Sequence, residues 1–221
     1  MKSTIKAIIF DLDGTLLDTL DDIADSMNHV LKVHGLPEQP VEAFKLFIGD
    51  GVTNLVSRAA MAAEADKAGL DFAKLETEYR AEYELRQADK TAPYDGVPEL
   101  VKALSERGIK MAVLSNKPHE ATVQIIKDYF PGIFFDSVLG QSPGRPVKPD
   151  PSGALEILDA LGVPRREIIY LGDSGTDMRL AKAVGIMAVG ALWGFRGRTE
   201  LTQNGADAFA EGPIDVLTFF E

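Results

Sequence analysis

The amino-acid sequence predicts an α/β fold, a doubly wound parallel sheet that carries a small, inserted all-helical domain. Beyond residue 91, short apolar runs alternate with helical stretches, the pattern of a parallel sheet covered by helices. Residues 16–90 instead have helical character, and they follow a single apolar run near the start of the chain. We therefore expect residues 1–15 and 91–221 to form an α/β core, with residues 16–90 as a helical cap domain, or lid.

The first strand is predicted at Ala7–Phe10, an uninterrupted apolar run that suits a strand buried on both faces. It runs directly into Asp11 and Asp13. Because side chains alternate along a strand, these two carboxylates project toward the same side. Gly14 then allows a sharp turn and lets the backbone approach a ligand closely. Such a strand end suits an oxyanion neutralised by a hard cation.

The inserted segment is predicted to consist of helices. Apolar residues recur at three- and four-residue intervals over residues 20–31, and Gly35 ends the pattern. A short apolar-rich segment at 41–48 follows. A further helical region is predicted up to Lys90, broken at Gly69, because Thr77 is the only β-branched residue between Ala59 and Lys90.

Strands and helices alternate in the remainder of the chain. We expect strands at 109–114, 134–139 and 168–171, another at 186–192, and an edge strand at 206–210. Helices are expected from about Pro98 to Gly108, at 120–129, at 154–161, and in a stretch that ends at Val184.

Composition narrows the class of protein. The chain has 221 residues, of which 45% are hydrophobic and 26% charged, and it contains no cysteine. A net charge of −11 without a basic block argues against nucleic acid as a partner. No run reaches the roughly 18 apolar residues that a membrane span needs, and the N-terminal run is too short for a signal peptide. We expect a cytoplasmic protein, monomeric or homodimeric, without membrane partners.

Polar residues gather where the predicted strands end. They are Asp11 and Asp13, Ser115 and Asn116, Lys148, and Asp173 with Asp177. In open α/β sheets, ligands bind outside the carboxyl ends of the strands, so we expect these side chains to converge.

The sequence motifs at these strand ends also resemble those of a known family. Asp11-Leu12-Asp13-Gly14-Thr15-Leu16 resembles the first motif of the haloacid dehalogenase-like (HAD) phosphohydrolases. Ser115-Asn116, Lys148-Pro149 and Gly172-Asp173-Ser174 with Asp177 resemble its second, third and fourth motifs, in the same order. The resemblance spans essentially the whole chain and is greatest to the phosphoglycolate phosphatase branch. It implies a Rossmann-like core with a helical cap.

The resemblance implies phosphoryl transfer to a carboxylate. Asp11 would attack phosphorus and form an aspartyl-phosphate, while Asp13 would act as general acid and base. Lys148 would offset the negative charge. A Mg²⁺ cofactor would be held by the side chains of Asp11 and Asp173 and by the Asp13 backbone carbonyl. Asp177 would orient a bound water or bind the metal directly.

Further residues are candidates for substrate contacts. The Ser115 hydroxyl and the backbone amides of Leu12, Asp13 and Asn116 would hold the phosphate oxygens. The cap would exclude water and contact the leaving group. Within it, Arg58 is a candidate anchor for a substrate carboxylate, with a surface ion pair as the alternative.

Two loop residues have no assigned role. Arg145 and His119 follow predicted strands and could border the cleft, and the sequence does not decide what they do.

The sequence thus predicts a Mg²⁺-dependent phosphatase for a small phosphorylated metabolite. By its resemblance, 2-phosphoglycolate is the leading substrate. Two alternatives share the same core residues: a phosphomutase resembling β-phosphoglucomutase, and a pyrophosphatase or nucleotidase of the same superfamily. The lid sequence alone does not choose between them. A haloacid dehalogenase is disfavoured, because the second acid, Asp13, characterises the phosphate-handling members of the superfamily.

Overall fold

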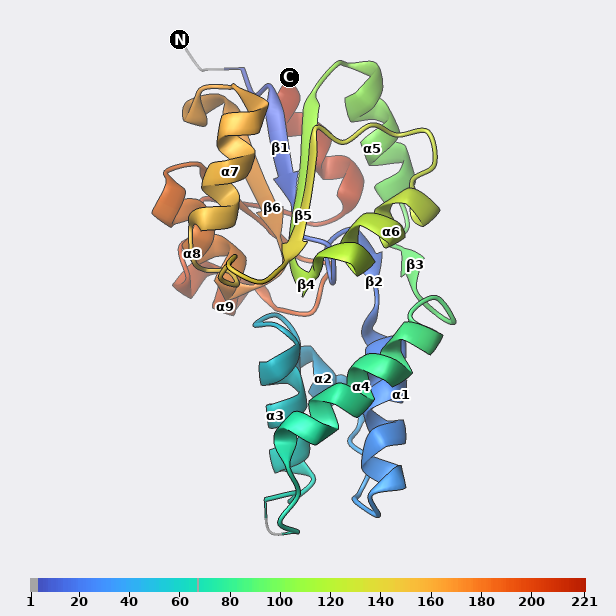
Figure 1. Ribbon diagram of the computed structural model, residues 1–221. Helices are drawn as coiled ribbons and strands as arrows, with labels where there is room; N and C mark the ends of the chain where they lie inside the picture. Colours follow the sequence, from blue (N-terminus) through green and yellow to red (C-terminus); the bar gives the residue numbers. More distant parts are fainter. Residues whose placement is uncertain (1–3, 67) are drawn as a thin grey trace. The chain divides into compact units, whose positions relative to one another are not determined.

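The structure is a computed structural model that describes residues 4–66 and 68–221 (Figure 1). Its backbone contacts divide the chain into two compact units. The core unit combines the N-terminal residues up to Leu17 with Pro93–Glu221, and the inserted unit is Asp18–Ala92. Within the described residues, every helix is too short or too polar to cross a membrane.

The core unit contains a parallel sheet, which confirms the predicted α/β class. Among the described residues it has six strands in the order β5-β4-β1-β6-β7-β8. Their bounds are β1 (Ala7–Phe10), β4 (Lys110–Pro118), β5 (Ser137–Gln141), β6 (Ile168–Gly172), β7 (Met187–Ala191) and β8 (Ala208–Ala210). The chain runs outward from β1 in both directions, so the strand order reverses at β1. This is the point in an open sheet where ligands bind.

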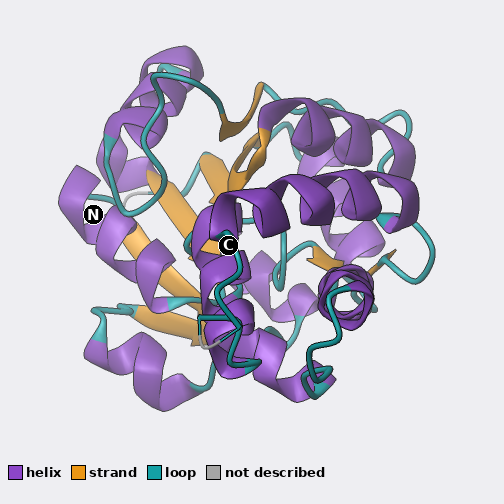
Figure 2. Ribbon diagram, turned by 60° about the horizontal axis from the view of Figure 1, so that its bottom comes forward, coloured by secondary structure: helices purple, strands orange, loops and turns teal. Residues whose placement is uncertain are grey.

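Helices cover both faces of this sheet. In Figure 2 the strands, in orange, lie between helices, in purple. One face is covered by α5 (Val97–Glu106), α6 (His119–Tyr129) and the 3₁₀ segment η2 (Pro213–Phe220). The other is covered by α7 (Ser152–Leu161) and α8 (Gly175–Val184), with α9 (Arg198–Gln203) beside them. A short 3₁₀ turn, η1 (Arg165–Glu167), leads into β6.

The position of β1 inside the sheet explains why its sequence is uniformly apolar. Ile8 and Phe10 pack into the cluster on the α5 side, and Ala7 and Ile9 pack into the cluster on the α7 side. All four side chains are fully buried. A central parallel strand has no polar face, because helices exclude water from both of its sides.

The inserted unit is built from helices. They are α1 (Leu20–Val33), α2 (Val41–Phe47), α3 (Val52–Ala62) and α4 (Phe72–Arg86). The apolar stripe of α4 is buried at Leu75, Tyr79 and Tyr83, and the two tyrosine rings stack with their centroids 5.8 Å apart. These residues therefore contribute to the packing of the unit.

A buried carboxylate joins the two ends of the inserted unit. Asp22 of α1 accepts hydrogen bonds from the Lys90 amide (3.0 Å), the Thr91 amide (2.8 Å) and the Thr91 hydroxyl (2.7 Å). Asp22 is 1% exposed. Nearby, the short strands β2 (Leu17–Asp18) and β3 (Ala92–Pro93) pair where the chain passes between the units.

Several elements differ from the sequence-based expectation. Strand β4 extends to Pro118, so Ser115 and Asn116 lie in its irregular end, where the register with β5 shifts. Strand β5 begins at Ser137 instead of residue 134, and Asp136 before it bonds to Met111 of β4 through its amide and its side chain. The pair β2 and β3, helix α9 and the segments η1 and η2 were not predicted, because short elements carry little periodicity.

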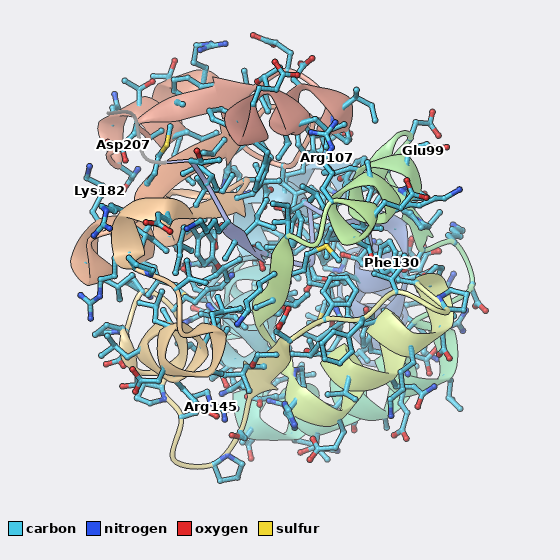
Figure 3. The ribbon with its side chains drawn as sticks, turned by 90° about the horizontal axis from the view of Figure 1, so that it is seen from above. Glu99, Arg107, Phe130, Arg145, Lys182 and Asp207 are labelled. Atoms are coloured by element: carbon cyan, nitrogen blue, oxygen red, sulfur yellow. The ribbon has the colours of Figure 1, made fainter. Side chains whose placement is uncertain are left out.

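An ion pair secures the far edge of the sheet (Figure 3). Lys182 Nζ of α8 lies 2.7 Å from Asp207 Oδ1, and the second oxygen of this carboxylate accepts a hydrogen bond from the Ala188 amide at 2.9 Å. Asp207 therefore connects β7, the start of β8 and α8.

We expect Asp22→Ala to lower the free energy of unfolding by about 3 kcal/mol, because buried backbone donors lose a charged acceptor. Thermal denaturation followed by circular dichroism would measure this loss. Asp21→Ala is the matched control, since Asp21 is the exposed neighbour on the same helical turn. Equal stability of the two variants would contradict the role of Asp22.

Candidate active site

Asp11 lies at the carboxyl end of β1, at the point where the strand order reverses. Its amide donates to the Leu171 carbonyl of β6 at 2.9 Å, which continues the ladder one residue beyond the strand. The Leu12 amide donates to Asp11 Oδ1 at 2.7 Å. Asp11 is 7% exposed, so its carboxylate is largely removed from water.

Lys148 places a buried ammonium beside this carboxylate. Its Nζ lies 2.7 Å from Asp11 Oδ1 and 2.8 Å from Asp177 Oδ1, and 3.3 Å from the Tyr170 hydroxyl. Asn116 fixes the backbone of Lys148 in both directions: its Oδ1 accepts from the Lys148 amide (2.7 Å), and its Nδ2 donates to the Lys148 carbonyl (3.2 Å). Residues from β4, β6 and α8 therefore meet at Lys148, which contacts Asp11.

Three carboxylates crowd around one point. Asp11, Asp173 and Asp177 each offer a carboxylate oxygen within 4.8 Å of the others, and all three residues are buried. With all three carboxylates ionised, Lys148 balances one of their charges and two negative charges remain. An all-oxygen donor set with that charge fits a hard divalent cation.

The crowding affects the pKa values of these groups. Burial, together with the nearby Asp177 carboxylate, raises the pKa of Asp11 well above its usual range. The same two causes raise the pKa of Asp173 to about 7. Burial disfavours the Lys148 ammonium, but the charges of Asp11 and Asp177 outweigh that effect and raise its pKa. A cation among the carboxylates would favour their ionised forms.

Asp173 is held by the loop that follows β7. The Phe195 amide donates to Asp173 Oδ2 at 2.7 Å, and the Thr15 hydroxyl donates to Oδ1 at 3.3 Å. The same loop is tied to the segment after β1, because the Trp193 indole N–H donates to the Thr15 carbonyl at 3.0 Å. Trp193 thus has a structural contact at the site edge.

Asp177 forms a capping box at the start of α8. Its Oδ2 accepts hydrogen bonds from the Ser174 amide (3.1 Å) and hydroxyl (2.6 Å), while Oδ1 contacts Lys148 and the Tyr170 hydroxyl. Both oxygens are therefore engaged with the protein. Asp177 is fully buried. Because both of its oxygens are held, it gives the Lys148 ammonium a fixed partner.

Glycines allow the segments that follow β1, β6 and β7 to approach one another closely. Gly14 has a φ of +83°, and a Cβ there would lie 2.4 Å from Asp173 Oδ2. A Cβ on Gly194 would lie 2.2 Å from the Gly14 carbonyl oxygen and 2.3 Å from the Asp173 Cβ. Any side chain at these positions would push the Asp173 carboxylate out of place.

The family model for haloacid dehalogenase-like hydrolases matches residues 8–191, a span from β1 to the end of β7. The chain belongs to this family. The phosphoglycolate phosphatase of Pseudomonas syringae pv. tomato is 34% identical over 206 residues, which cover 91% of this chain and 75% of that protein. The phosphoglycolate phosphatase of Aquifex aeolicus is 31% identical and covers 98% of this chain and 97% of its own length.

Solved structures agree with this assignment. The crystal structure of a predicted phosphoglycolate phosphatase from Haemophilus somnus has a TM-score of 0.89 and 28% identity, and the match covers 98% of each chain. The protein is therefore a HAD-like hydrolase with the fold of the phosphatases in that family. The motif residues Asp11, Asn116, Lys148, Asp173 and Asp177 occupy a single site in this hydrolase.

Sequence reasoning assigned no role to Lys117, which contacts the site directly. Its Nζ lies 2.8 Å from Asp13 Oδ1. The available signal was its position immediately after Ser115 and Asn116, in the irregular end of β4. Tyr170 was also missed, because its place within an apolar strand disguised a hydroxyl that points at Lys148.

Ser115 is buried beside the site. Its hydroxyl accepts a hydrogen bond from the Lys117 amide at 3.1 Å, and it lines a small pocket together with Asn116 and Lys148. Ser115 thus lines the same pocket as Asn116 and Lys148.

The remaining candidates are bound within their own surroundings. Arg145 donates to the Gly140 carbonyl (2.8 Å) and pairs with Glu156 (3.1 Å). His119 Nδ1 accepts from the Gly140 amide at 3.3 Å. Both residues therefore bond to Gly140 of β5.

In the inserted unit, Arg58 pairs with Asp50 and donates to the Phe47 carbonyl at 3.1 Å. This is the ion pair that the sequence left as an alternative. Use of Arg58 as a carboxylate anchor would require its guanidinium to leave Asp50.

We expect Gly194→Ala to lower the free energy of unfolding by about 1–3 kcal/mol, because the new methyl overlaps a backbone oxygen and the Asp173 side chain. Urea denaturation would measure the change. Gly197→Ala is the control in the same loop, where an added Cβ meets no atom within 4 Å. Similar losses in both variants would show that the close approach at Gly194 is relaxed.

Proposed function

We propose that this hydrolase is a phosphatase for a small phosphate monoester, with 2-phosphoglycolate as the leading substrate. The observation that carries the proposal is the buried contact of Lys148 with Asp11, beside the carboxylates of Asp173 and Asp177. The substrate follows from the names of relatives that match nearly the full chain.

In the first step, Asp11 acts as the nucleophile. One of its carboxylate oxygens attacks phosphorus, the bond from phosphorus to the leaving oxygen breaks, and that oxygen takes a proton from Asp13. The products are an aspartyl-phosphate and an alcohol. Lys148 reduces the repulsion between the Asp11 carboxylate and the phosphate, because its ammonium lies against the attacking group.

In the second step, water replaces Asp11. Asp13 takes a proton from the water as its oxygen attacks phosphorus, the bond to Asp11 breaks, and inorganic phosphate leaves. Asp13 is then protonated again for the next turnover. The Ser115 hydroxyl and the amides of Leu12, Asp13 and Asn116 are the proposed donors to the phosphate oxygens in both steps.

Mg²⁺ is the proposed cofactor, and when bound it would neutralise the charge shared by the carboxylates and the phosphate. Asp11 and Asp173 would hold it with their side chains, and Asp13 with its backbone carbonyl. Both oxygens of Asp177 already accept hydrogen bonds or contact Lys148. We therefore propose that Asp177 positions Lys148 and the ligand-bearing loop instead of binding the ion.

The inserted unit is the proposed lid. Its helices would exclude water during the reaction and select the leaving group. The absence of cysteine is consistent with the proposed cytoplasmic location.

Phosphate release from a panel of substrates tests the reaction class. We expect the purified protein with MgCl₂ to hydrolyse 2-phosphoglycolate in preference to sugar phosphates, nucleotides and pyrophosphate. Asp11→Asn should lower kcat by about 10³-fold or more, because it removes the nucleophile. Full turnover by Asp11→Asn would contradict the mechanism. Preference for pyrophosphate or a nucleotide, or a requirement for a sugar bisphosphate, would replace the substrate or indicate a phosphomutase.

Metal binding can be tested apart from activity. Mg²⁺ at ten times its dissociation constant should stabilise the fold by about 1.4 kcal/mol, seen as a rise in Tm. Asp173→Asn should abolish most of this rise, whereas Asp159→Asn, at an exposed position of α7, should retain it. An unchanged rise in Asp173→Asn would place the ion elsewhere.

A further inference from the structure

Asp13 and Lys117 form a buried ion pair at the edge of the proposed active site. The Lys117 Nζ lies 2.8 Å from Asp13 Oδ1, and the side chains are 4% and 13% exposed, respectively. A buried ammonium is costly unless a carboxylate compensates for its lost hydration. The position of one side chain therefore constrains the position of the other.

The backbone of Lys117 is held in place by β4, α6 and β5. Its amide donates to the Ser115 hydroxyl at 3.1 Å, and its carbonyl accepts from the Thr122 hydroxyl of α6 at 3.3 Å. Strand β5 approaches closely at Gly140, where a Cβ would lie 2.6 Å from the Lys117 carbonyl oxygen. The main chain of Lys117 is thus fixed, and its side chain is presented to Asp13 from a rigid support.

Two lysines divide the two carboxylates that follow β1. Lys148 contacts Asp11 at 2.7 Å, and Lys117 contacts Asp13 at 2.8 Å. These two carboxylates therefore contact different lysines, although the two acids are only two residues apart. The proposed nucleophile and the proposed proton donor are held by separate supports.

We propose that Lys117 is a positioning residue for Asp13, and that its ammonium holds the Asp13 carboxyl group in the orientation that delivers a proton to the leaving oxygen. The inference rests on the proposed function, because it needs Asp13 as the proton donor. As the bond between phosphorus and the leaving oxygen breaks, that oxygen takes the proton of Asp13, and Lys117 keeps its own protons. A general acid is effective only within hydrogen-bond reach of the reacting oxygen, so a displaced Asp13 would slow this step.

The test compares two leaving groups. An alkyl phosphate, for which 2-phosphoglycolate is the probe, leaves as an alkoxide that needs a proton, whereas p-nitrophenyl phosphate leaves as a stabilised phenolate. The ratio kcat/KM reports the steps up to the breaking of this bond. We expect Lys117→Met to lower kcat/KM for the alkyl phosphate by about 30-fold or more, and that for p-nitrophenyl phosphate by less than about 3-fold.

Matched variants separate positioning from other effects. Lys117→Arg should restore part of the activity toward the alkyl phosphate, since it returns a cation to the site. Lys127→Met, at an exposed position of α6, should match the wild type. If Lys117→Met does not fold, Lys117→Gln replaces it and should give the same dependence on the leaving group.

A double-mutant cycle completes the test. Asp13→Asn should show the same preference for the activated leaving group, and adding Lys117→Met to it should cost less than about 3-fold more. Equal losses on both substrates in Lys117→Met, or additive losses in the double variant, would overturn the proposal.

Failure of the proposed function would look different from failure of this inference. In that case the wild type would release no phosphate, or Asp11→Asn would keep its turnover on both substrates. If those two proteins behave as expected while Lys117→Met loses equally on both substrates, the role of Lys117 alone is wrong.

Discussion

The contact between the Lys148 ammonium and the carboxylates of Asp11 and Asp177 is the interaction on which the site depends. Removing these charges from water is unfavourable, and their mutual attraction offsets that cost only in a tightly defined geometry. The fold supplies this geometry by fixing each partner independently. Asn116 fixes the backbone of Lys148, Ser174 fixes Asp177, and the β1–β6 ladder fixes Asp11.

Burying several like charges is unfavourable for folding, and the proposed chemistry needs these charges close together. This HAD-like hydrolase keeps several acidic groups close together in a buried place, and burial, together with the nearby Asp177 carboxylate, raises the pKa of Asp173 to about 7. The segments that carry these groups extend from a buried, apolar sheet. Strand β1 is fully buried on both faces, so the loop that follows it begins from a rigid position. The site is therefore carried by a fully buried part of the core.

Backbone groups also contribute to this organisation. The Phe195 amide holds Asp173, and the indole of Trp193 links the same loop to Thr15. Glycines at 14 and 194 make the close approach possible. The loop after β7 lies far along the chain from the first motif. It nevertheless holds Asp173, the carboxylate that lies beside Asp11 of that motif.

The sequence by itself determined the alternation of the longer strands and helices, the buried character of β1 and the motif residues Asp11, Lys148 and Asp173. These follow from local periodicity and from residue types that a phosphate site needs, so they are legible without coordinates. Only the tertiary structure decided the pairing of Lys117 with Asp13, the hydroxyl contact of Tyr170 with Lys148 and the amide of Phe195 at Asp173. Such contacts join residues that are far apart in sequence, and they depend on strand register and loop path, which no local pattern encodes.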